Sequence, residues 1–147
     1  MLNNRKYIVG ILVLIYVASL PFTGFCYRET NCWQGWGILA FGALGLLDGY
    51  QMSWLANVFL WLAWGALLTR SKTGDWGALA SACFALLVGN AFLLQGVDTS
   101  EAGVSLEPVS SLGPGYALWM ACQAATALVG AHGVLHRRSA AASTRGK

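Results

Sequence analysis

Charged side chains are scarce in this chain. Asp, Glu, Lys and Arg make up 10% of its 147 residues, against about a quarter in soluble globular domains. Hydrophobic residues make up 56%. Because so few polar side chains cannot cover a soluble globule, the composition predicts an all-α integral membrane protein whose main solvent is lipid.

Catalytic and nucleic-acid-binding signatures are also missing. The sequence has no H-E-x-x-H motif, no Gly-rich phosphate loop after a strand, and no arrangement of Ser, His and acid suited to nucleophilic catalysis. The net charge of +3 comes from basic residues near the chain ends and in one loop, so there is no concentrated basic patch. We therefore expect no enzymatic activity, no cofactor and no nucleic-acid partner.

The two histidines, His132 and His136, form the one pattern that is compatible with a metal or haem site. They are four residues apart, so they would share one face of a helix. A metal site needs a third and usually a fourth ligand, and the nearest acid on that side of the membrane is Asp75. We interpret the pair as a polar helix end beside the lipid headgroups and expect no metal.

Uncharged runs divide the chain into candidate membrane helices. Residues 33–47 and 54–68 contain 15 residues each, which corresponds to roughly 22 Å of helix against a hydrocarbon core of about 30 Å. The remaining runs, 7–25, 76–95 and 116–135, are long enough to span that core. The number of true spans therefore depends on the two short runs.

The basic residues decide how many runs cross the membrane. If both short runs crossed, the basic residues would divide three against six between the two sides. If one short run stays on the outer side, eight of the nine are cytoplasmic and Arg28 alone is outside. We therefore predict four transmembrane helices, at about residues 7–25, 54–69, 76–95 and 115–136, with both termini in the cytoplasm.

The partial helix is expected at residues 33–47, on the outer side of the membrane. This run contains four glycines, which have low helix propensity and suit close packing: Gly35, Gly37, Gly42 and Gly45. We predict a short re-entrant or interfacial helix there. Residues 1–138 then form a single membrane domain, and residues 139–147 form a disordered cytoplasmic tail.

Two short motifs open the predicted second and fourth transmembrane helices. They are Trp54-Leu55-Ala56-Asn57 and Gly115-Tyr116-Ala117-Leu118-Trp119. Together with the short Gly- and Trp-rich segment, this layout resembles an uncharacterised family of small four-span bacterial inner-membrane proteins, from Cys32 to about Leu135. Val58 stands where that pattern has Pro. The resemblance implies the four-span fold in the bacterial inner (cytoplasmic) membrane, and it carries no known activity.

Cys26 and Cys32 flank a five-residue polar loop on the predicted outer side. That side of a bacterial inner membrane is oxidising, so we predict a disulfide that ties the first span to the partial helix. A reactive redox pair is the alternative, but the C-x-x-C spacing typical of such pairs is missing.

Three polar residues are candidates for contact with an ion or a partner. Asp48 lies between two apolar runs, where an acid is a functional candidate, although Asp48-Gly49 is also typical of a solvated turn. Asn57 and Gln123 each lie about one turn inside the outer boundary of a predicted span, so their amides could meet at one depth. We interpret these amides as hydrogen-bonding groups between helices, with a polar path for a solute as the alternative.

Small residues recur at every fourth position on the third and fourth predicted spans. They are Gly77, Ser81, Ala85 and Gly89 on the third span, and Ala117, Ala121 and Ala125 on the fourth. Such stripes let helices approach closely. We expect the two spans to pack together along them, with a stripe kept for a partner as the alternative.

Taken together, these features favour a non-catalytic binding protein that acts on another membrane component. An accessory subunit of a membrane complex or an immunity-type protein would have this layout of few spans and small loops. Its expected partners are the lipid bilayer and either another membrane protein or a second copy of itself. The alternative is a small oligomeric channel or transporter, which would need more polar residues on shared faces.

Overall fold

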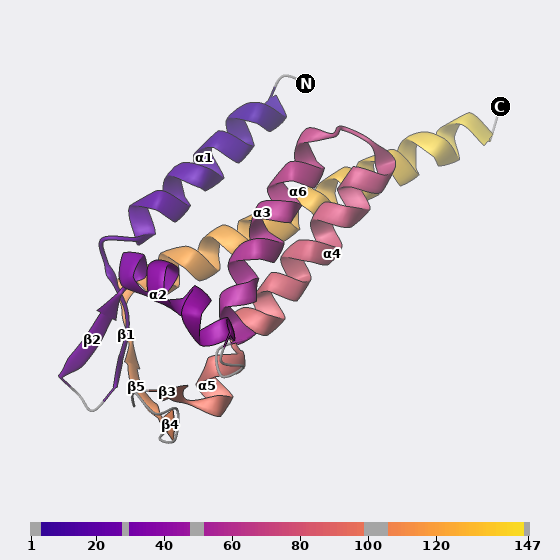
Figure 1. Cartoon of the computed structure of the whole chain (residues 1–147). Helices are drawn as coiled ribbons and strands as arrows, with labels where there is room; N and C mark the ends of the chain where they lie inside the picture. Colours follow the sequence, from indigo (N-terminus) through magenta and orange to yellow (C-terminus); the bar gives the residue numbers. More distant parts are fainter. Residues whose placement is uncertain (1–3, 28–29, 48–51, 99–105, 146–147) are drawn as a thin grey trace.

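The computed structural model describes residues 4–27, 30–47, 52–98 and 106–145, which are mostly helical with a small sheet at one end (Figure 1). The helices are α1 (Asn4–Ser19), α2 (Gly35–Leu47), the 3-10 helix η1 (Met52–Trp54), α3 (Leu55–Leu68), α4 (Lys72–Gly89), α5 (Ala91–Gln95) and α6 (Pro114–Arg145). The strands are β1 (Thr23–Tyr27), β2 (Asn31–Gln34), β3 (Val97–Asp98), β4 (Leu106–Glu107) and β5 (Val109–Leu112).

A bundle of α1, α3, α4 and α6 forms the body of the protein (Figure 1). α3 and α4 form a hairpin that packs against α6, and α1 lies along α6 and α3. In the hairpin turn, Ser71 caps the start of α4, where its Oγ accepts a hydrogen bond from Gly74 N at 2.8 Å. Small side chains allow close approach inside the bundle, and Ala78, Ala82 and Ala85 of α4 are completely buried.

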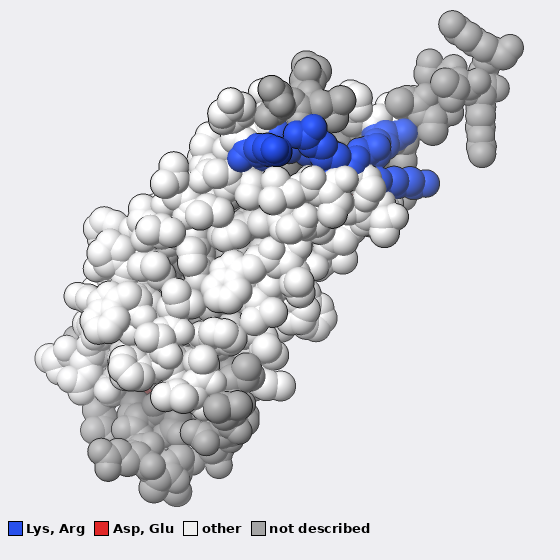
Figure 2. All heavy atoms as spheres, turned by 45° about the horizontal axis from the view of Figure 1, so that its top comes forward, with Lys and Arg blue, Asp and Glu red and all other residues white. Residues whose placement is uncertain are grey.

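The outer surface of the bundle is apolar. Only 28% and 33% of the most apolar stretches of α4 and α6 are buried, so most of each stretch is exposed. Leu87 and Leu128, for example, are 72% and 70% exposed. Lys and Arg side chains gather at one end of the molecule, and the visible surface between the ends is almost free of charge (Figure 2).

Within the described residues, two segments are long and apolar enough to cross a membrane, Lys72–Leu94 and Pro114–Arg137. The prediction of four transmembrane helices is therefore not supported. α3 has 14 residues, and α1 has 16 and ends at Ser19 rather than near residue 25. An apolar run does not by itself distinguish helix from strand, and part of the first run belongs to β1.

A small antiparallel sheet lies at the end of the bundle opposite the basic residues, which corrects the all-α prediction (Figure 1). Its strand order is β2-β1-β5, and a separate pair joins β3 to β4. β1 therefore pairs with a neighbouring strand and with β5, which comes from the loop just before α6. Strands this short give little period-two signal, and the β1–β5 pairing is decided by the fold.

The other predicted segments agree with the structure to different degrees. The predicted partial helix corresponds to α2, which begins at Gly35 after β2. The backbone of residues 139–145, where a disordered tail was predicted, continues α6 as far as Arg145. Asp48 and the turn that contains it lie outside the described residues.

One buried carboxylate joins three elements at the basic end of the bundle. Asp75 is 0% exposed, and its Oδ1 accepts a hydrogen bond from Arg5 Nη1 of α1 at 2.5 Å. Its Oδ2 accepts one from Arg137 Nε of α6 at 2.7 Å, and Arg137 Nη2 donates to the backbone oxygen of Arg70. Gly133 leaves the necessary room, since a Cβ there would lie 2.7 Å from Asp75 Cγ. We call Arg5, Asp75 and Arg137 the Asp75 clasp.

We predict that Asp75→Asn lowers the free energy of unfolding by about 2 kcal/mol, because two guanidinium groups lose their shared counter-charge in a partly buried site. Lys72→Gln is the matched control, since Lys72 is an exposed charge on the same helix, and it should change stability by less than about 0.5 kcal/mol. Unfolding in detergent micelles, followed by circular dichroism, measures both variants. If Asp75→Asn and Lys72→Gln were equally stable, the stabilising role of the Asp75 clasp would be contradicted.

Candidate functional site

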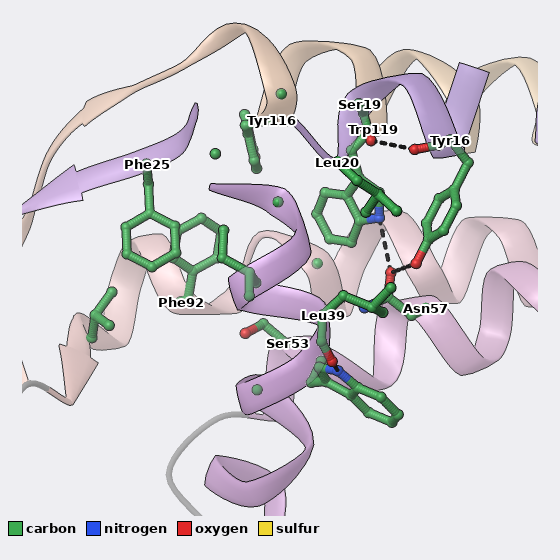
Figure 3. Close-up of a pocket in the computed structure, with 18 residues that line it drawn as sticks. Tyr16, Ser19, Leu20, Phe25, Leu39, Ser53, Asn57, Phe92, Tyr116 and Trp119 are labelled. Atoms are coloured by element: carbon green, nitrogen blue, oxygen red, sulfur yellow. Dashed lines mark hydrogen bonds between the residues drawn. The ribbon is translucent and has the colours of Figure 1, made fainter. Parts of the chain in front are cut away.

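A pocket of about 70 Å³ lies between the bundle and the sheet (Figure 3). A buried water molecule needs about 10–15 Å³ on this measure, so the pocket has room for several groups of that size. Its walls come from elements far apart in the chain, including α1, β1, α2, α3, α5 and α6. None of the described residues that line it carries a charge. The pocket therefore suits an apolar, uncharged guest.

Aromatic rings form the wall nearest the sheet. Phe25 of β1 and Phe92 of α5 have ring centroids 5.4 Å apart, and Tyr116 of α6 lies 5.8 Å from Phe92. Val97 of β3 packs with Phe25 and Phe92 in a small separate core. The sheet thus brings together apolar side chains that the bundle alone would leave apart, and they close one end of the pocket.

The opposite wall contains a buried polar cluster centred on Asn57 of α3 (Figure 3). Asn57 Oδ1 accepts hydrogen bonds from Tyr16 OH of α1 at 3.1 Å and from Trp119 Nε1 of α6 at 3.0 Å. An indole N–H can only donate, which identifies the atom facing Trp119 as the amide oxygen. One side chain therefore joins three helices at the wall of the pocket.

Helix α2 covers a further side of the pocket through Ile38 and Leu39. Trp54 Nε1 of η1 donates a hydrogen bond to the backbone oxygen of Leu39 at 2.9 Å, which holds α2 against the start of α3. Gly42 permits this close approach, because a Cβ there would lie 2.6 Å from Trp54 Cδ1. The opposite face of α2 leaves Phe41 exposed at the surface.

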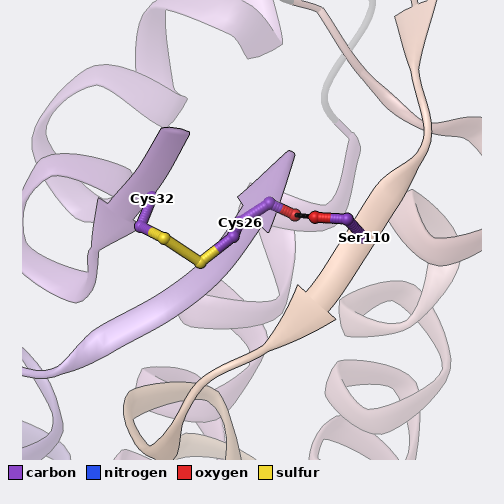
Figure 4. Close-up of a disulfide and its surroundings, with 3 residues drawn as sticks. All are labelled: Cys26, Cys32 and Ser110. Carbon is purple, nitrogen blue, oxygen red and sulfur yellow. Dashed lines mark hydrogen bonds between the residues drawn. A yellow bond between two sulfur atoms is a disulfide. The ribbon is translucent and has the colours of Figure 1, made fainter. Parts of the chain in front are cut away.

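The hairpin of β1 and β2 leads the chain into α2. Cys26 and Cys32 face each other across this hairpin and form a disulfide with an S–S distance of 2.03 Å (Figure 4). Ser110 Oγ of β5 also donates a hydrogen bond to the backbone oxygen of Cys26 at 2.9 Å. The predicted Cys26–Cys32 disulfide is thus confirmed at bonding distance. It cross-links the hairpin that precedes α2, the helix that covers one side of the pocket.

The two predicted amides have different surroundings. Asn57 has the partners described above, and no hydrogen bond joins it to Gln123 within the described residues. Gln123 is 0% exposed, and neither atom of its amide group has a hydrogen-bond partner there. Gln123 also does not line the pocket. The structure therefore places only Asn57 at the candidate site.

The small-residue stripes are distributed over several interfaces. Gly77 faces Ala66 of α3, and Gly89 faces both Trp119 of α6 and Ala56 of α3. The rest of the α4 stripe is buried or half-buried, whereas Ala117 and Ala121 of α6 are exposed and Ala125 is half-buried. Other residues bring α6 close to α4, namely Gly130 against Leu79 and Gly133 against Asp75.

His132 and His136 are exposed near the basic end of α6, with ring centroids 6.1 Å apart. Across the part of the chain that the structure describes, no group of three or more His, Cys, Asp or Glu side chains is arranged to hold a metal ion. The pair is therefore not joined there by the third ligand that a metal site would need.

Two residues of the polar cluster around Asn57, Tyr16 and Trp119, were not identified from the sequence. Trp119 belongs to the motif Gly115-Tyr116-Ala117-Leu118-Trp119 and Tyr16 to the first predicted span, and the sequence pattern assigns a partner to neither. A Tyr or Trp within an apolar run does indicate a polar contact, because a buried O–H or N–H group usually needs a hydrogen-bond acceptor. The sequence offered no way to identify Asn57 as the acceptor.

Comparison with protein-family models, with curated proteins and with solved structures gives no match to this chain. The family resemblance noted in the sequence therefore stays a prediction. The function has to be argued from the geometry of the site.

We predict that the disulfide protects two of the four cysteines from alkylation when the protein is denatured without reductant, leaving Cys83 and Cys122 to react. The double variant Cys26→Ser with Cys32→Ser should lose about 2 kcal/mol of stability, because the cross-link closes only a short loop. Alkylation followed by mass spectrometry measures the first effect, and denaturant unfolding measures the second. Four alkylated cysteines would show that the bond does not form.

Replacing the two buried amides should have opposite effects. Gln123→Leu should raise the free energy of unfolding by about 1 kcal/mol, because it removes a buried amide that has no hydrogen-bond partner among the described residues while nearly keeping its volume. Asn57→Leu should lower it by about 2 kcal/mol, because Tyr16 and Trp119 lose their shared acceptor. Denaturant unfolding in micelles compares the two variants. A loss of similar size in both would contradict this assignment.

Proposed function

We propose that the protein is a non-catalytic binding protein of a bacterial inner membrane, and that its pocket holds the apolar part of a membrane lipid. The observation that carries this proposal is the pocket, in which aromatic and aliphatic side chains surround space for several methylene-sized groups. Binding sites for small molecules commonly have mainly apolar walls and a few placed polar groups. A lipid matches this chemistry and is abundant wherever an apolar bundle resides.

The proposed orientation places the Asp75 clasp in the cytoplasm and the sheet at the outer surface. Arg5, Arg70, Lys72 and Arg137 belong to the clasp end, which agrees with the excess of basic residues on the cytoplasmic side of membrane proteins. The disulfide lies at the other end, as an oxidising outer space would favour. In this arrangement α4 and α6 cross the membrane, and α1 and α3 are shorter helices packed beside them.

The proposed route of entry is from the outer leaflet, past α2. This helix is uncharged and leaves Trp36, Phe41 and Leu44 exposed, which suits the boundary between headgroups and acyl chains. Because α2 also lines the pocket, a chain that reaches the pocket along this helix would stay in contact with apolar surface. The acyl chain of the lipid would therefore not need to pass through water.

We predict that Ser53→Phe reduces the lipid retained by the purified protein roughly tenfold, because the added ring occupies space that Ser53 lines. Met52→Phe is the matched control, since Met52 is the neighbouring residue, is exposed and does not line the pocket. Native mass spectrometry of protein released from membranes in a mild detergent measures bound lipid in the wild type and both variants.

Each other result of this experiment has a defined meaning. Equal retention of lipid by Ser53→Phe and Met52→Phe would overturn the proposal. A stoichiometric protein partner with no lipid would favour an accessory subunit or immunity-type protein instead. Ion conductance through reconstituted wild-type protein, undiminished in Ser53→Phe, would favour the channel alternative.

A further inference from the structure

The pocket contains one amide group whose donors are left for a guest. Both side-chain hydrogen bonds that Asn57 makes within the described residues end on Oδ1, and neither uses Nδ2. An Asn side chain carries two N–H donors on this nitrogen. Asn57 lines the pocket, so an acceptor on the guest would complete its hydrogen bonding.

Most of the other side-chain donors that line the pocket are already used. Tyr16 OH and Trp119 Nε1 both donate to Asn57, and Trp54 Nε1 donates to the Leu39 backbone oxygen. Ser19 Oγ donates to the Tyr16 backbone oxygen at 2.6 Å. Tyr116 OH donates to Asn90 Oδ1. Asn57 Nδ2 and the Ser53 hydroxyl are therefore the lining side-chain donors for which no acceptor is found among the described residues, and Asn57 lies in the polar cluster opposite Phe25 and Phe92 (Figure 3).

The charge of the surroundings limits what this acceptor can be. No charged side chain is found among the described residues that line the pocket, so an ionised carboxylate or phosphate would be buried without a counter-charge. Such burial is strongly unfavourable. A neutral carbonyl oxygen can accept a hydrogen bond from an amide without that cost.

We infer that the guest is an ester-linked acyl chain whose carbonyl oxygen accepts a hydrogen bond from Asn57 Nδ2. The ester and the first methylene groups fill the pocket against Phe25 and Phe92, because about 70 Å³ cannot hold a whole chain. The remainder of the lipid and its headgroup stay in the surrounding leaflet. This inference rests on the proposed function and adds the chemical group that the pocket recognises.

Paired lipids that differ only in the linkage test this inference. Wild-type protein is offered a diacyl phosphatidylglycerol and its dialkyl ether analogue, which has the same chains and headgroup but no carbonyl group. Competition measured by native mass spectrometry should favour the ester about fivefold, the effect expected of one neutral hydrogen bond. A long-chain free fatty acid forms a third arm, and it should bind more weakly than the ester at pH 8, where its carboxyl group is ionised.

Asn57→Leu is the informative variant, because it removes the amide donors without placing a carboxyl group, ionised or protonated, in the pocket. It should bind ester and ether equally. Gln123→Leu is the matched control, since it removes a buried amide that does not line the pocket, and it should keep the preference for the ester. If Asn57→Leu does not fold, the comparison of ester with ether in the wild type still decides.

The outcomes separate this inference from the proposed function. If the wild type bound ester and ether equally, and the Ser53→Phe variant lost both lipids, the ester inference would be overturned. The lipid-binding function would then still stand. Binding of neither lipid would overturn both. Tighter binding of the free fatty acid than of the ester would show that the pocket accepts a carboxyl group, contrary to the inference.

Discussion

The candidate site depends on a single amide oxygen. Asn57 of α3 accepts hydrogen bonds from Tyr16 of α1 and Trp119 of α6, and all three residues line the same pocket. In an apolar environment, donors such as these have few other acceptors, so each is strongly directed to the one that is present. The position of α1 relative to α3 and α6 at this end of the bundle follows from that constraint.

At the basic end of the bundle, a single buried acceptor group again joins several helices, here through ion pairs. Asp75 of α4 binds Arg5 of α1 and Arg137 of α6, so it joins both of these helices to α4. Between these two polar clusters the helices contact one another mainly through small, aliphatic and aromatic side chains, and Trp64 Nε1 of α3 donates a hydrogen bond to Thr126 Oγ1 of α6 at 3.1 Å. Polar contacts such as these specify which helix faces meet, an arrangement that general apolar packing would leave loose.

The sheet and the disulfide turn an end of this bundle into a pocket. β1 places Phe25 opposite Phe92. The hairpin closed by Cys26 and Cys32 leads the chain into α2, which covers one side of the pocket. Glycines at the crossing points allow the backbone and large rings to approach closely, as Gly42 does beside Trp54. The pocket is thus a product of the connections between the helices more than of the helices themselves.

The sequence by itself determined the apolar character of the chain, the position of the short helix α2 and the pairing of Cys26 with Cys32. These properties depend on composition and on residues close together in the chain, which local patterns report. Only the tertiary structure decided that Asp75 meets Arg5, 70 residues away, and that Asn57 meets Trp119, 62 residues away. It also decided that helix α1 ends early and that a sheet forms at the pocket. The physical reason is that a hydrogen bond between distant residues depends on how whole helices pack, and the periodicity of a single segment carries no information about which donor will reach which acceptor.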